Sequence, residues 1–62
     1  MDLRFAVLEL CGQWRVVAVF SSRSNATVFA RNLLGTHAMV EIDSVLSSEE
    51  TENIFNGVED LF

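Results

Sequence analysis

The sequence predicts an α+β domain with the element order β-β-α-β-α. Three short segments are rich in β-branched and aromatic residues, and two others carry apolar residues at helical spacing behind a serine. The length limits the number of domains, because domains usually have about 50 to 200 residues and 62 residues are enough for only one. We therefore expect residues 1–62 to form a single small α+β domain.

The first two strands are predicted to form a hairpin. Apolar residues dominate segments 3–10 and 14–20, and the three residues between them include Gly12, which is typical of a hairpin loop. Regular alternation would place four side chains on one face of the second strand: Trp14, Val16, Ala18 and Phe20. Both faces of the hairpin are largely apolar, so both need a cover. Either the second helix or a partner, such as another copy of the chain, could cover the second face.

A helix is predicted over 23–34 and a third strand over 37–46. Ser22 is a good N-cap and Gly35 a good stop. One apolar stripe lies between them: Ala26, Phe29, Ala30 and Leu33. The third strand alternates apolar with polar residues, which is typical of a sheet edge. A right-handed crossover then places it antiparallel beside the first strand, in the sheet order 2-1-3.

The second helix is predicted to begin after Ser47. Glu50 follows this serine by three residues, as in a capping box. An apolar stripe continues to the end of the chain: Ile54, Phe55, Val58, Leu61 and Phe62. Gly57 lies inside this pattern and should weaken the helix by about 1 kcal/mol.

Negative charge is concentrated in the last third of the chain. Residues 1–40 contain four arginines and two acids, whereas residues 41–62 contain seven acids and no base, and the net charge is −5. Direct binding to nucleic acid is disfavoured, because phosphates need neutralising cations. The acids either form a binding surface for a basic partner or only a solvated surface that keeps the protein soluble.

Residues suited to catalysis are few. His37 is the only histidine, and it would act as a general base only inside a pocket. Cys11, the only cysteine, is predicted to lie in the hairpin turn, with no basic cluster in the sequence nearby to activate it. We therefore expect no enzyme, no cofactor and no metal site. A single cysteine, no signal-peptide pattern and no apolar run of about 20 residues favour a cytoplasmic protein without a membrane span.

The hairpin and the first helix resemble small phage-type proteins of the hairpin-helix-strand outline. The resemblance runs through the pattern Trp-x-Val-x-x-Val-Phe-Ser-Ser of residues 14–22 and continues in the helix and its end: Ala26, Phe29, Ala30, Leu33 and Leu34. Some proteins of this kind block host defence or host enzymes by binding them. The resemblance thus implies a small binding protein acting in the host cytoplasm, and it assigns no site residue.

The functional hypothesis is a non-enzymatic, acidic inhibitor that docks on a basic site of a host protein, such as a nucleic-acid-binding protein. Seven residues are predicted to contact the partner: Glu41, Asp43, Glu49, Glu50, Glu52, Glu59 and Asp60. Glu49, Glu52 and Glu59 are expected on the side of the second helix away from its apolar stripe. The alternative is a homodimeric structural or regulatory module whose charge only aids solubility, and self-association through apolar surface is expected.

Overall fold

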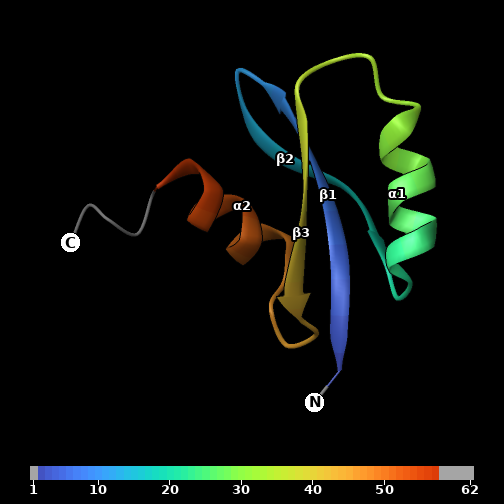
Figure 1. Ribbon diagram of the computed structural model, residues 1–62. Helices are drawn as coiled ribbons and strands as arrows, with labels where there is room; N and C mark the ends of the chain where they lie inside the picture. The colour runs from blue at the N-terminus through green and yellow to red at the C-terminus, as the bar shows by residue number, and fades with distance from the viewer. Residues whose placement is uncertain (1, 58–62) are drawn as a thin grey trace.

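The sheet and helices follow the predicted order. The computed structural model describes residues 2–57. Its elements are β1 (Leu3–Cys11), β2 (Gln13–Phe20), α1 (Arg23–Arg31), β3 (His37–Asp43) and α2 (Ser48–Asn56) (Figure 1). The strands form one antiparallel sheet in the order β2-β1-β3. The predicted α+β class, element order and sheet order are therefore confirmed.

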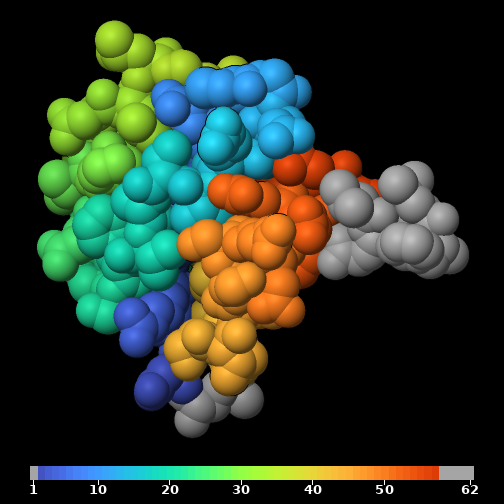
Figure 2. Space-filling model, turned by 180° about the vertical axis from the view of Figure 1, so that it is seen from behind, coloured from blue at the N-terminus to red at the C-terminus, as the bar shows by residue number. Residues whose placement is uncertain are grey.

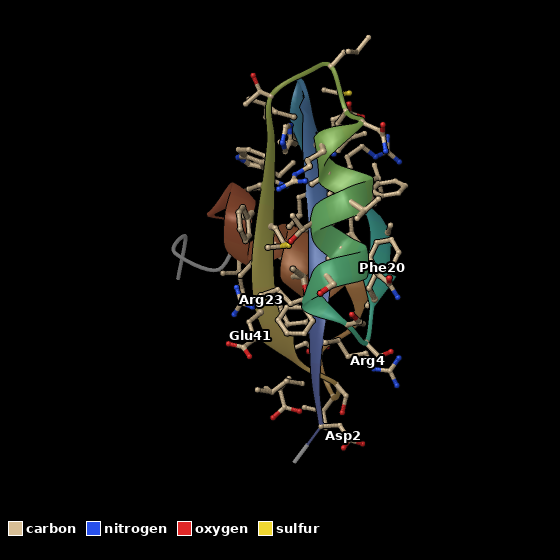
Figure 3. All side chains as sticks on the ribbon, turned by 45° about the vertical axis from the view of Figure 1, so that its right-hand side comes forward. Asp2, Arg4, Phe20, Arg23 and Glu41 are labelled. Carbon is tan, nitrogen blue, oxygen red and sulfur yellow. The ribbon has the colours of Figure 1, made fainter. Side chains whose placement is uncertain are left out.

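The central strand β1 is buried on both faces. Ala6, Val7 and Leu8 are all 0 % exposed. Ala6 and Leu8 belong to a cluster that includes Phe55 of α2, whereas Val7 packs with the α1 side of the sheet. The two helices thus cover opposite faces, as Figure 3 shows with α1 in front of the sheet and α2 behind it. Of the two covers that the sequence leaves open for the second face, the structure shows the helix.

A β-bulge at Val17 interrupts β2, so the expected regular alternation is wrong. Val7 is opposite Ala18, but its neighbour Leu8 is opposite Val16, which leaves Val17 as the extra residue. The even-numbered side chains before the bulge, Trp14 and Val16, therefore face the α2 side, whereas those after it, Ala18 and Phe20, face the α1 side. As a result, Trp14 packs with the α2 cluster while Phe20 packs with the α1 cluster.

Because of this bulge, β2 contributes one aromatic contact to each helix. The Trp14 and Phe55 rings are 5.6 Å apart in an edge-to-face arrangement, at 67° between planes. Phe20 and Phe29 of α1 lie 5.5 Å apart and are tilted by 51°. Such pairs contribute about 0.5 to 1.5 kcal/mol beyond area burial.

Both α1 and β3 end earlier than expected. The helix stops at Arg31, where the N–H of Asn32 bonds back to the last turn. The strand stops at Asp43, because its carboxylate accepts from the Val45 N–H at 3.1 Å and its carbonyl accepts from the Leu46 N–H at 3.0 Å. These bonds turn the chain toward α2 instead of extending the strand.

The start of α2 agrees with the sequence, but within the described residues its buried face agrees only at Phe55. Ser47 and Glu50 form the predicted capping box. Gly57 is a left-handed C-cap with φ 72° rather than an interior helical residue. Ile54, expected in the buried stripe, is 53 % exposed, whereas Thr51 is 2 % exposed. The rest of the expected stripe lies outside the described residues: Val58, Leu61 and Phe62.

Truncating Phe55 should therefore destabilise the domain much more than truncating its neighbour Ile54. Phe55→Ala removes the ring that packs on the Ala6–Leu8 side of the sheet and against Trp14, so we expect a loss of about 3 kcal/mol. Ile54→Ala, at an exposed position, should cost under about 1 kcal/mol. Urea unfolding of both variants measures the difference, and equal losses would contradict this assignment of the buried face.

Candidate functional site

The structure does not bring the predicted acidic residues together as one solvated face. Within the part of the chain it describes, Glu41 on β3 and Glu49 on α2 are exposed. Three other acids make hydrogen bonds within the fold: Asp43, Glu50 and Glu52. Glu59 and Asp60 lie outside the described residues. The candidate binding surface is therefore smaller than the acid content suggests.

Glu52 accepts a hydrogen bond from the outer edge of β2. Its Oε2 accepts the Val16 backbone N–H at 2.7 Å. One helical turn later, Asn56 accepts the Trp14 N–H at 2.8 Å and donates its amide to the Trp14 carbonyl at 3.1 Å. The backbone groups of Trp14 and Val16 point away from β1, and they are bonded by Asn56 and Glu52, which lie one helical turn apart on the same side of α2. Glu52 therefore faces the sheet edge, against the expectation that it points to solvent.

Glu50 and Asp43 have local structural roles. Glu50 Oε1 accepts the Ser47 N–H at 2.9 Å, and the Ser47 hydroxyl accepts the Glu50 N–H at 3.1 Å. Asp43 accepts the Val45 N–H in the turn before α2. Both carboxylates satisfy backbone donors that would otherwise need water or another acceptor. Their charge remains part of the surface potential, but their positions are set by the fold.

Glu41 lies beside Phe5, an aromatic residue whose ring is covered by the guanidinium of Arg23. It is the cross-strand partner of Phe5 on β1, and the guanidinium carbon of Arg23 lies 5.2 Å from the centroid of the Phe5 ring. Figure 3 labels Arg23 and Glu41 at the same end of the sheet. The arginine stacks on the aromatic face, a geometry that contributes about 0.5 to 1 kcal/mol at an exposed site.

The outer edge of β3 differs from that of β2. The N–H of Leu10 bonds to the Thr36 carbonyl and the N–H of Ser44 to the Asp2 carbonyl. In an antiparallel ladder these bonds alternate, so the even-numbered residues of β3 face β1. The N–H and C=O groups of His37, Met39 and Glu41 therefore point outward. Within residues 2–57 no side chain bonds to the outward groups of Met39 or Glu41, as Glu52 and Asn56 do at β2.

Residues with catalytic chemistry are exposed at the hairpin end of the sheet. Cys11 is exposed, with its Sγ 4.0 Å from Glu9 Oε1. His37 is exposed too, and its Nδ1 lies 2.9 Å from the Gly35 carbonyl oxygen. The part of the chain that is described has no pocket around either side chain. Nor does it bring three His, Cys, Asp or Glu residues together in an arrangement that could hold a metal ion.

Removing the Glu52 carboxylate should open one end of the β2 edge. Glu52→Ala leaves the half-buried Val16 N–H without its acceptor, so we expect a loss of about 1 to 2 kcal/mol and faster hydrogen exchange at Val16. Glu52→Gln retains an oxygen acceptor and should lose less. Glu49→Ala, on the exposed side of the same helix, is the matched control, and an equal loss there would contradict the role given to Glu52.

Comparison with known proteins adds no relative to this description. No family model, curated protein or solved structure matches the chain. Among residues 2–57, neither helix has the length and apolar character needed to cross a membrane. Inference about function therefore depends on the two sheet edges and the exposed acids.

Proposed function

We propose that the chain is a non-enzymatic binding protein that docks on a basic surface of another protein. The observation that carries the proposal is the pair of exposed carboxylates, Glu41 and Glu49, on a domain whose described residues contain no pocket. Small-molecule and catalytic sites are concave, whereas a flat, charged exterior suits contact with a macromolecule. An inhibitor that occludes a basic site in a cytoplasmic host protein fits this surface.

Electrostatics support a basic partner. The net charge is −5, and residues 41–62 contain no lysine, arginine or histidine. A field of one sign speeds encounter with an oppositely charged surface and suppresses binding to phosphate-rich competitors. A partner whose own basic site binds nucleic acid would therefore be blocked by this protein without the protein itself binding nucleic acid.

Reversing the charges of Glu41 and Glu49 should weaken docking and leave the fold intact. Glu41→Lys combined with Glu49→Lys changes exposed side chains, for which we expect under about 0.5 kcal/mol each in stability. Association with a partner captured by the wild-type protein should slow by at least about tenfold at 50 mM salt, and the difference should shrink at 200 mM. Surface-binding kinetics at both salt concentrations measure this.

The control for this experiment is Arg15→Glu combined with Arg31→Glu, since both arginines are also exposed. This variant should retain or increase the association rate. An unchanged rate for the double lysine variant would show that the acidic residues only keep the protein soluble.

A homodimeric structural or regulatory module is the second candidate function. It is favoured by large apolar side chains that the described residues leave exposed: Leu3, Leu10, Val17, Val19, Val28, Leu34, Val45 and Ile54. Apolar surface of this kind marks contact sites when it is contiguous. Under this proposal the charge has no target of its own.

Sedimentation tests the second candidate directly. A homodimer held by apolar surface should have a mass near twice 6.9 kDa at micromolar concentration, with little change as salt rises. A mass of 6.9 kDa at every concentration would contradict the homodimer and leave the docking function in place.

A further inference from the structure

The outer edge of β3 is an unpaired strand edge along most of its length. Met39 and Glu41 point their N–H and C=O groups away from β1, and His37 does so at the beginning of the strand. Figure 1 shows β3 in front of the sheet, with neither helix lying over it in that view. Such an edge is a template for another strand, because each outward residue offers one donor and one acceptor.

At the β2 edge, side chains of α2 hydrogen-bond to the outward backbone groups of the strand. There, Glu52 and Asn56 supply three hydrogen bonds to the backbone of Trp14 and Val16. Figure 2, seen from behind, shows the atoms of α2 lying against β2. No described side chain has the corresponding position at β3. Side chains of α2 thus close the β2 edge at Trp14 and Val16, whereas the outward groups of Met39 and Glu41 on β3 have no such partner among the described residues.

The side chains of β3 define what a fourth strand must carry. On the α1 side of the sheet the edge shows the half-buried Met39 and the exposed, anionic Glu41. On the α2 side it shows Val40, which packs only partly into the core. A complementary strand therefore alternates, with basic residues beside Glu41 on one face and apolar residues beside Val40 on the other.

We propose that β3 accepts an extended segment of the partner protein as a fourth strand, with lysine or arginine alternating with apolar residues. This inference rests on the proposed docking function and assigns the contact to β3. Main-chain hydrogen bonds would supply affinity, and the alternating side chains would supply specificity. A second copy of the chain fits this edge less well. Its own β3 carries Glu41 and Asp43 but no lysine or arginine, and both copies have a net charge of −5.

Synthetic peptides test the proposal without altering the fold. The probe is an acetylated and amidated peptide of alternating lysine and valine, as long as the seven residues of β3. Two analogues carry N-methyl groups, one on every lysine and the other on every valine. In a paired strand, only one of these two sets of N–H groups faces β3. We expect one analogue to lose at least about tenfold in affinity through its missing hydrogen bonds and the other to bind within about threefold of the parent.

The site of binding is read from the protein. Backbone amide signals of Met39 and Glu41 should shift and exchange more slowly with the parent peptide bound. Glu41→Gln should weaken binding several-fold, whereas Glu52→Gln, which neutralises a carboxylate at the opposite β2 edge, should change it little. A peptide of alternating glutamate and valine should not bind. Shifts centred on β2, or no saturable binding at about 1 mM peptide, would overturn the proposal.

The outcomes separate this inference from the docking function. If both N-methylated analogues bind as well as the parent, the interaction is only electrostatic, and the fourth strand is refuted. If the lysine variants at Glu41 and Glu49 still lose the partner in that case, the docking function stands. A two-fold dimer with protected β3 amides in the absence of peptide would instead show that the occupant of this edge is a second copy.

Discussion

The constraint on which the structure depends is that β1 has no solvent-facing side at its centre. Ala6, Val7 and Leu8 are consecutive and all 0 % exposed, so alternate side chains require apolar cover on both faces of the sheet. A chain of 62 residues has room for one short helix on each side. Small residues bring one of them close, since Ala26 and Ala30 are the α1 residues buried in the same cluster as Val7. Neither helix can be removed without exposing part of this strand.

The bulge at Val17 follows from the same constraint. Without it, Trp14 and Phe20 would lie on one face and a single helix would have both aromatic residues. The extra residue places the two side chains on opposite faces of the sheet, so Trp14 contacts Phe55 and Phe20 contacts Phe29. One irregularity in an edge strand thus gives each layer its own aromatic contact.

Sequence patterns were sufficient for the fold because periodicity and capping agree along the chain. The strands, both N-caps and the sheet order all follow from apolar spacing, serine positions and the handedness of the crossover. The bulge could not be predicted this way, because Val17 and its neighbours are all strand formers and no glycine marks the irregularity. The register between β1 and β2 accompanies tertiary contacts of Trp14 and Phe20 with different helices, which the local sequence does not encode.

The buried face of α2 was the least predictable part of the site. It is formed by Thr51 and Phe55, one turn apart, with Glu52 and Asn56 beside them. Three of these four side chains are polar, so a search for an apolar stripe finds Phe55 but adds the exposed Ile54 and misses Thr51. The available signal was the spacing of four between Glu52 and Asn56, which places both on the side of the helix next to Phe55.

Hydrogen bonding separates acids with a structural role in the fold from an acid that is free to contact a partner. Glu50, Glu52 and Asp43 accept from backbone N–H groups, so their positions are explained by caps, turns and the β2 edge. Net charge alone therefore overstates the described surface that is available for a partner. Glu41 is different, because it is exposed on β3, where the outward backbone groups of Met39 and Glu41 have no partner within the described residues. Charge and open hydrogen-bonding groups coincide there, and a partner that satisfies both must present an extended backbone together with a cation.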